Sequence, residues 1–162
     1  DRVAYSDFDI QARQYISKKL EQINAEVYTD FAGNLIAIYN PNNSSLNPIS
    51  FGSHIDAVPN GGHYDGPVGV ISAIEVLQTA HYKKINFSHP LELIIFSNEE
   101  GGVFGSRALA GKINNETLEV VTVSGYTNRE GVNRLGGNSN RIFEEKRKLG
   151  DIRQTIWCER FD

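Results

Sequence analysis

Three consecutive stretches decide the fold: "ISFGSHID" (residues 49–56), "GPVGVISAIEVLQTAHYKK" (66–84) and "PLELIIFSNEE" (90–100). The first and third are short apolar runs, which are typical of buried strands. The middle stretch is apolar on most sides and long enough for a helix that packs against a sheet. A strand, a helix and a strand in this order form a βαβ unit, so the sequence predicts two parallel strands.

The segments before this unit add a helix and two more strands. "SDFDIQARQYISKKLEQI" has apolar residues at helical spacing, which predicts a helix over about residues 7–24 with Ser6 as its N-cap. "AEVYTD" (25–30) and "NLIAIYN" (34–40) are β-rich runs separated by "FAGN", which predicts two strands joined by a tight turn. The expected fold is therefore a three-layer α/β/α arrangement around a largely parallel central sheet.

Composition narrows the classes of partner. The chain has 162 residues, 40% of them hydrophobic, which is enough for one domain with a real core. A formal net charge of -4 gives no reason to expect nucleic acid or an anionic membrane as a partner. Cys158 is the single cysteine, which excludes an internal disulfide and makes a reducing, cytoplasmic setting the default expectation. No stretch approaches the roughly 18 to 20 apolar residues of a membrane helix.

Acidic and imidazole side chains follow both strands of the βαβ unit. In an open α/β sheet, ligands bind just beyond the carboxyl ends of the strands. The first strand ends in His54 and Asp56, and the second ends in Glu99 and Glu100. Asp65 lies where the glycine-rich loop enters the helix. If the two strands are parallel neighbours, all five side chains are expected at one rim of the sheet.

The types and spacing of these residues suit a metal site. His54 and Asp56 are two residues apart, so a carboxylate behind the imidazole would fix its tautomer and leave the other ring nitrogen free for a metal. The adjacent pair Glu99 and Glu100 is costly when both are ionised without a cation. With a cation, one carboxylate binds it and the other accepts a proton from water, and the residues alone leave this division open. Asp65 could bridge two metals roughly 3.5 to 4 Å apart.

Each of these motifs also has an ordinary structural explanation. His54 could be a structural histidine with satisfied hydrogen bonds, and the glutamate pair could be a solvated turn. "NGGHYDG" could be a turn in which Gly61 and Gly62 supply positive φ angles. Because the motifs occur together at successive strand ends, the metal site is the favoured interpretation.

The other histidines are not expected to be ligands. His63 lies within the glycine-rich turn rather than on a strand. His81 and His89 flank the end of the helix and the start of the next strand, at the opposite edge of the sheet, and are expected to be structural or exposed.

Three motifs resemble one known family. "GSHIDAVPNGGHYDGPVGV", "FSNEEGGVFGSRALAG" and "SGYTNREGVNRLGG" resemble the zinc-dependent amidohydrolases of the M20 metallopeptidase group, in its hydantoinase/carbamoylase branch. That branch includes N-carbamoyl-L-amino-acid hydrolases, allantoate amidohydrolases and β-ureidopropionases. "FGSRALAG" separates this branch from the peptidase branches. The resemblance runs over about residues 2–152.

The resemblance implies a role for each candidate residue. His54 would be a terminal ligand of one metal, Asp65 the bridge between two metals, and Glu100 a ligand of the second. Glu99 would be the general base, and Asp56 the partner behind His54. The metal would usually be zinc, with manganese, cobalt or nickel as substitutes, which suits a set of nitrogen and oxygen ligands. The substrate would be a small ureide or N-carbamoyl amino acid, hydrolysed by a homodimer that associates through a lid domain.

The chain departs from the family pattern after "KLGDI". There the family has a strand with a His-Ile-Glu-Gln-Gly-like motif, whose histidine is the third ligand of the first metal. This chain instead reads "RQTIWCERFD", with Glu159 at about the position of that histidine. The family's lid and its late histidine are also missing. We therefore expect residues 1–152 to be a partial catalytic domain and residues 153–162 a divergent tail, as a truncation with a shifted reading frame would produce.

Two classes of function remain open at this stage. The first is a metal-dependent amidohydrolase that cleaves a carbamoyl or ureido C–N bond. The second is a non-catalytic remnant, because each metal would keep two of its protein ligands, whereas a catalytic zinc site usually has three plus water. On this basis the chain as given is expected to be inactive or nearly so. An aminopeptidase of the same metallopeptidase group is a further alternative.

Overall fold

The helices and strands follow the predicted order. The structure is a computed structural model that describes residues 1–157. In chain order its elements are α1 (Asp7–Glu21), β1 (Glu26–Thr29), β2 (Leu35–Tyr39), β3 (Ile49–His54), α2 (Pro67–Tyr82), β4 (Leu91–Phe96), α3 (Phe104–Leu109), α4 (Asn115–Leu118), α5 (Asn128–Arg134), the 3-10 helix η1 (Ile142–Glu145) and β5 (Gln154–Trp157). The predicted first helix is confirmed, and the Ser6 side chain accepts a hydrogen bond from the Asp9 amide as its N-cap.

The strands form one sheet in the order β1-β2-β4-β3-β5. β3 runs parallel to β4, with His54 opposite Phe96, and β5 runs parallel to β3 on its other side. β2 is antiparallel to both β1 and β4. Among the strands that the structure describes, β2 alone therefore runs against the others, which confirms the βαβ unit and the largely parallel sheet. The β5 strand also shows that the first residues of the predicted divergent tail join this sheet.

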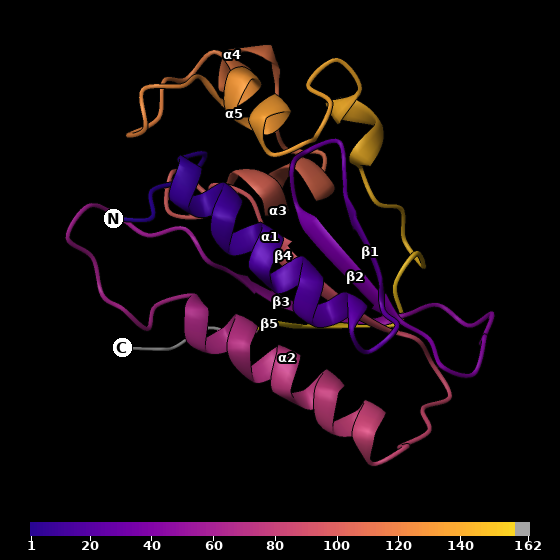
Figure 1. Cartoon of the computed structure of the whole chain (residues 1–162). Coiled ribbons are helices and arrows are strands. Elements are labelled where there is room, and N and C mark those ends of the chain that lie inside the picture. Colours follow the sequence, from indigo (N-terminus) through magenta and orange to yellow (C-terminus); the bar gives the residue numbers. More distant parts are fainter. Residues whose placement is uncertain (158–162) are drawn as a thin grey trace.

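Helices cover both faces of the sheet (Figure 1). One face carries α1 and α2, and the core there combines alternate residues of the strands with the inner faces of the two helices: Ile16, Leu20, Leu35, Ala37, Leu77, Leu93 and Ile95. On the other face, Ile36, Ile94 and Phe96 pack against Leu109 of α3. This alternation follows from the two-residue period of a strand, and it confirms the three-layer arrangement.

The tight turn between β1 and β2 is organised by Asp30. Its Oδ1 accepts hydrogen bonds from the amides of Ala32 at 2.9 Å and Asn34 at 2.8 Å, and its Oδ2 accepts from the Asn34 side chain at 2.7 Å. Gly33 has a φ of 81°, a conformation that favours glycine. The Asn34 side-chain oxygen in turn accepts from the Ser97 amide at 2.9 Å, so the turn also holds the end of β4.

Asp30→Ala is expected to lower the free energy of unfolding by about 2–3 kcal/mol, because it leaves buried amide donors without their acceptor. Asp30 is buried, so water cannot replace the lost carboxylate fully. Chemical denaturation monitored by circular dichroism measures the change. The matched control is Asp151→Ala, which removes an exposed carboxylate that caps the Lys148 amide, and a loss under about 1 kcal/mol is expected there. Equal losses in the two variants would contradict the role given to Asp30.

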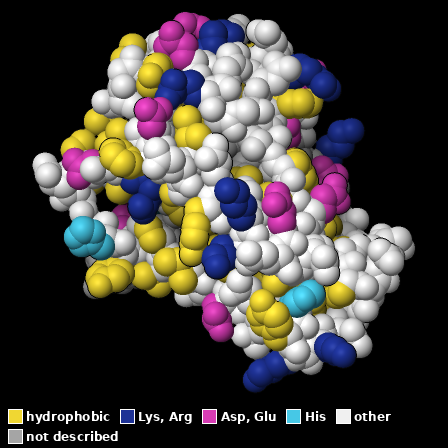
Figure 2. Space-filling model, in the orientation of Figure 1, with side chains coloured by type: hydrophobic (Ala, Val, Ile, Leu, Met, Phe, Trp, Pro, Cys, Tyr) yellow, Lys and Arg dark blue, Asp and Glu magenta, His cyan; other side chains and the backbone are white. Residues whose placement is uncertain are grey.

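Hydrophobic side chains also gather between α1 and α2, where the core reaches the surface (Figure 2). A groove of about 600 Å³ lies there, lined by Tyr15 and Ile16 of α1 and by Val70, Ile71 and Ile74 of α2.

Within residues 1–157, none of the helices has the length and apolar character that crossing a membrane requires.

Candidate metal centre

The carboxyl ends of β3 and β4 place four of the candidate side chains at one rim. The strands end side by side, because His54 is opposite Phe96 in the parallel ladder. The chain then continues into Asp56 on one side and into the glutamate pair on the other. The His54 Nε2 lies 3.6 Å from the Glu99 Oε2. The Glu100 amide donates to the Asp56 Oδ2 at 3.2 Å, which ties the two strand ends together.

His54 has a defined orientation. Its side chain is 1% exposed, and its Nδ1 lies 3.0 Å from the backbone carbonyl oxygen of Asp56. A carbonyl oxygen only accepts, so this contact places a ring proton on Nδ1, and Nε2 is the nitrogen that faces Glu99. The Asp56 carboxylate is farther away, with its Oδ1 3.8 Å from Nδ1. The tautomer is therefore fixed by the carbonyl of Asp56 and not, as the sequence suggested, by its carboxylate.

The Asp56 carboxylate is fully buried. Its Oδ2 accepts from the Glu100 amide, whereas its Oδ1 has no hydrogen-bond partner among the described residues. Burial raises the pKa of Asp56, and the nearby His54 ring acts in the opposite direction. A buried carboxylate oxygen without a donor is costly, and positive charge at the rim would offset that cost. This orphaned oxygen is therefore consistent with a cation in the neighbourhood of His54.

Asp65 is placed differently from the other candidates. It is exposed, at the end of the glycine-rich loop, whereas Glu100 is half-buried at the rim. Within residues 1–157, no three His, Cys, Asp or Glu side chains are grouped closely enough to hold a metal ion. The predicted ligands His54, Asp65 and Glu100 are therefore not assembled into one cluster in this structure. Glu159, considered as a replacement ligand, lies outside the described residues.

Gly66 fits the loop tightly against the imidazole. Its φ is 74°, and an added Cβ would lie 2.5 Å from the Cε1 and 2.6 Å from the Nδ1 of His54. Gly61 and Gly62, which the sequence suggested as the residues with positive φ, do not have it, and Asn60 has a φ of 56° instead. The expectation was wrong because the Gly61 amide closes a turn onto the Val58 carbonyl at 3.0 Å, and the left-handed position of that turn falls on Asn60. The Gly-Pro step at the start of the helix was the available signal.

Gly66→Ala is expected to destabilise the protein by about 2–4 kcal/mol and to displace the His54 ring. The added methyl group combines a strained φ with overlap against a buried side chain. Thermal unfolding measures the loss, and the NMR signals of the imidazole report the displacement. Gly62→Ala is the matched control, because nothing lies within 4 Å of an added Cβ there, and its stability should stay within about 0.5 kcal/mol. A shifted imidazole signal in Gly62→Ala would contradict this explanation.

A buried hydrogen-bond network holds the turn that carries the glutamate pair, and no sequence motif indicated this network. Asn98 has a φ of 45°, and its side-chain amide donates to the Asn128 Oδ1 at 2.8 Å. The Tyr5 hydroxyl donates to the same oxygen at 3.0 Å. An added Cβ on Gly101 would lie 2.1 Å from the Asn98 Oδ1, so glycine closes the turn on the other side. Asn98 and Asn128 stand 30 residues apart in sequence, and no local pattern signals their pairing.

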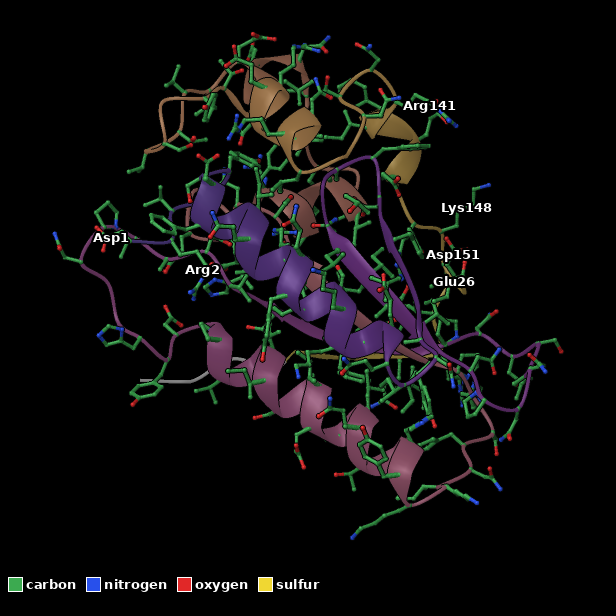
Figure 3. All side chains as sticks on the ribbon, in the orientation of Figure 1. Asp1, Arg2, Glu26, Arg141, Lys148 and Asp151 are labelled. Atoms are coloured by element: carbon green, nitrogen blue, oxygen red, sulfur yellow. The ribbon has the colours of Figure 1, made fainter. Side chains whose placement is uncertain are left out.

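The N-terminal segment packs along the same rim. Arg2 lies between α1 and the start of α2 (Figure 3), and its Nε donates to the carbonyl of Ile55. The Ala57 amide donates to the Arg2 carbonyl at 2.9 Å. These contacts hold the residues that flank Asp56 on both sides.

The remaining histidines lie away from this rim or are exposed, as predicted. His63 is exposed in the loop. His81, in the last turn of α2, makes an edge contact with the Tyr39 ring at a centroid distance of 6.1 Å. The His89 Nδ1 lies 2.7 Å from the carbonyl oxygen of Asn47, at the start of β4.

The fold and the rim together have the form of a peptidase-like catalytic domain. The model of Peptidase family M28 matches residues 34–156. The chain therefore belongs to Peptidase family M28. Its relatives include N-carbamoyl-L-amino acid amidohydrolases and hydantoinase/carbamoylase family amidases, which confirms the predicted resemblance to that group of enzymes.

Individual relatives support this membership. The chain is 33% identical over 160 residues to an N-carbamoyl-L-amino acid amidohydrolase from Geobacillus stearothermophilus, covering 96% of this chain and 39% of the relative. It is 34% identical over 152 residues to an allantoate deiminase from Arabidopsis thaliana, covering 90% of this chain and 28% of the relative. A hydantoinase/carbamoylase family amidase from Burkholderia ambifaria superposes with a TM-score of 0.78 at 29% identity, over 85% of this chain and 36% of that one. The chain thus spans well under half the length of these proteins.

Proposed function

We propose that this chain carries the first part of a metal-dependent centre that hydrolyses the carbamoyl or ureido C–N bond of a small molecule. The observation that supports this best is the pairing of the His54 Nε2 with the Glu99 carboxylate, 3.6 Å apart at the carboxyl ends of two parallel strands. Because Nδ1 contacts the Asp56 carbonyl, Nε2 is the ring nitrogen directed towards Glu99 and the rim. The N-carbamoyl amino acid amidohydrolases among the relatives supply the class of bond.

The proposed ligands are His54, Asp65 and Glu100, with Asp65 shared between two ions. Zinc is the first choice, and manganese, cobalt or nickel are substitutes, because the set contains nitrogen and oxygen donors without thiolate. Bound divalent ions supply the positive charge that polarises a carbonyl and lowers the pKa of water towards about 7. Assembly of this set requires the exposed Asp65 to turn towards the rim from its place in the loop.

Glu99 is the proposed general base. Its carboxylate would take a proton from the water that attacks the carbonyl carbon, and the same proton would pass to the nitrogen as the C–N bond breaks. Asp56 would act through His54 and Glu100 rather than on the substrate, since its carbonyl orients the ring and its carboxylate holds the Glu100 amide. A carboxylate at the rim is accessible enough for this role, because the Glu99 side chain is 13% exposed.

We propose that residues 1–162 alone bind metal weakly and turn over slowly. The assigned ligands give two protein groups to each ion, whereas a catalytic zinc site usually has three plus water. The lone Cys158 is compatible with the cytoplasmic setting that we propose. We propose no lid domain and no lid-mediated homodimer for residues 1–162 alone.

A direct assay tests the proposed activity. The purified chain is incubated with Zn²⁺ and either an N-carbamoyl-L-amino acid or a dipeptide, and released amine is measured with and without a chelator. Slow release from the carbamoyl compound that the chelator abolishes is the expected result. Release that persists in the chelator would rule the metal mechanism out.

An aminopeptidase is the second candidate, because the family model that matches is a peptidase model. Metal-dependent cleavage of the dipeptide without cleavage of the carbamoyl compound would favour it. If neither substrate is cleaved while zinc still binds, the non-catalytic alternative is supported.

A further inference from the structure

Three valines are exposed beside the rim, on the loop between α4 and α5. Val120, Val121 and Val123 are 51%, 64% and 71% exposed. Isolated exposed apolar residues are common, but these three stand within four positions and all line one cavity. In Figure 1 this loop extends beside the N-terminal segment, away from the body of the domain.

The loop is held in a defined shape. The Thr122 amide donates to the Tyr126 carbonyl at 2.8 Å, and the Gly125 amide donates back to the Thr122 carbonyl at 2.9 Å. Val121 also forms an isolated antiparallel bridge with Thr127. These hydrogen bonds close a compact hairpin-like turn, so the valines are displayed at fixed positions instead of being exposed through disorder.

The position of the loop relative to the candidate centre is also fixed. The Asn128 amide donates to the Val120 carbonyl at 3.0 Å, and the Asn128 side chain accepts from Asn98, which directly precedes the glutamate pair. One asparagine therefore connects the valine loop to the turn that carries Glu99 and Glu100.

A cavity of about 160 Å³ lies between the valine loop and the rim. Its lining includes Val120 to Val123, Val58 and Pro59, together with Asp56 and Glu100. No Lys or Arg of the described residues lines it. Its volume equals that of about five water molecules, enough for a branched group of four or five heavy atoms. An aliphatic group in this cavity would gain contact with the valines.

We propose that this cavity takes the aliphatic side chain of the substrate, so that the preferred substrates are N-carbamoyl amino acids with a branched apolar side chain rather than polar ureides. The proposal rests on the proposed function, because it assumes that the reacting bond lies at the His54–Glu99 rim. The valines are then specificity residues that contact substrate without taking part in the chemistry.

Paired probes test this directly in the full 162-residue chain. Dissociation constants of N-carbamoyl-L-leucine and N-carbamoylglycine, which differ by an isobutyl group, are measured by NMR titration in the presence of Zn²⁺. The leucine compound should bind about ten-fold more tightly, because most of its extra carbon atoms leave water. Val121→Asp and Val123→Asp should each reduce this ratio to within about two-fold. Val123 takes no part in the bridge to Thr127, so its variant does not depend on that contact.

Val76→Asp is the matched control, since Val76 is an exposed valine of α2, 53% exposed, that does not line this cavity. The ratio of its two dissociation constants, for N-carbamoylglycine and N-carbamoyl-L-leucine, should equal that of the wild type. Equal affinity for both probes, absence of binding by either, or a loss of preference in Val76→Asp as well would overturn the proposal. Preferential binding of the leucine compound without hydrolysis would support the cavity and count against the proposed function. Hydrolysis of both probes at equal rates would support the proposed function and count against the cavity as a specificity site.

A second copy of the chain could also cover an apolar patch. Sedimentation velocity distinguishes this case. A wild-type dimer that Val123→Asp converts to a monomer, with an unchanged ratio of probe affinities, would assign the valines to self-association and overturn the substrate pocket.

Discussion

His54→Ala is expected to weaken zinc binding by at least about 100-fold. Loss of a group that merely supports a ligand costs 10–100-fold in metal affinity, so loss of a ligand should reach the upper end of that range or exceed it. The Nε2 of His54 is the nitrogen that the structure leaves available at the rim, since the Nδ1 is engaged by the Asp56 carbonyl. Isothermal titration of the chain with Zn²⁺ measures the change.

Two further variants distinguish a metal ligand from a general base and from a histidine that does not bind the metal. Glu99→Gln removes the charge of the proposed base but keeps its shape, and zinc affinity should change by less than about ten-fold while hydrolysis falls by about 100-fold or more. His63→Ala removes an exposed histidine of the neighbouring loop and should leave zinc affinity unchanged. If His63→Ala weakens binding as much as His54→Ala, the metal lies in the loop, and the proposed centre is wrong.

The sheet could be predicted from the sequence because its signals are local. The apolar runs that became β3 and β4 are bounded by turn residues, and the helical stretch between them has the right length for a crossover. Once β3 and β4 are parallel neighbours, the meeting of His54 with Glu99 follows from the geometry of the sheet. The common rim of β3 and β4 was therefore predictable before the structure.

The β5 strand was not predictable in the same way. Residues 154–157 lie in the segment that the sequence predicts to be a divergent tail, and they are too short to give a periodic pattern. They are extended because the edge of β3 offers unpaired backbone groups, and Ile49 to Gly52 pair with Gln154 to Trp157 there. Such pairing depends on a partner strand about 100 positions earlier in the chain, which no local reading of the sequence detects.

The buried ion pair between Asp9 and Arg13 escaped prediction for a related reason. A charged pair four residues apart on a helix, as at Asp9 and Arg13, is the usual pattern of a solvated helix face. In this protein both side chains are buried. The pattern of charges therefore indicates the spacing along the helix but does not say whether the pair faces water or the interior.

Arg13→Met is expected to lower the free energy of unfolding by about 3–5 kcal/mol, because it leaves a buried charge unpaired. The Arg13 Nε donates to the Asp9 Oδ1 at 2.9 Å. Its other nitrogens donate to the carbonyl oxygens of Gly33 and Phe96, each at 3.0 Å. The variant thus removes one donor from the buried carboxylate and one from each of the two carbonyl oxygens. Urea denaturation gives the value.

A double variant and a surface control test whether the unpaired charge causes the loss of stability. Asp9→Asn combined with Arg13→Met removes both charges and keeps an acceptor for the Tyr5 amide, which donates to the Asp9 carboxylate at 2.9 Å. It should be less destabilised than Arg13→Met alone, because replacing a whole buried pair is less costly than breaking it. Arg129→Met removes the exposed pair with Glu119 and should cost under about 1 kcal/mol. A double variant as unstable as the single one would contradict the unpaired charge as the cause.

Arg13 also contacts the end of the strand that leads into the candidate centre. Phe96 is the last residue of β4, and its carbonyl lies three positions before Glu99 in the chain. Arg13 therefore connects α1, the turn at Gly33 and the strand end that presents the glutamate pair. If this connection positions Glu99, Arg13→Met should also weaken zinc binding in urea-free buffer, where the variant is still folded. The Arg129→Met control should not, because its guanidinium lies on the exposed surface of α5 and contacts neither strand end.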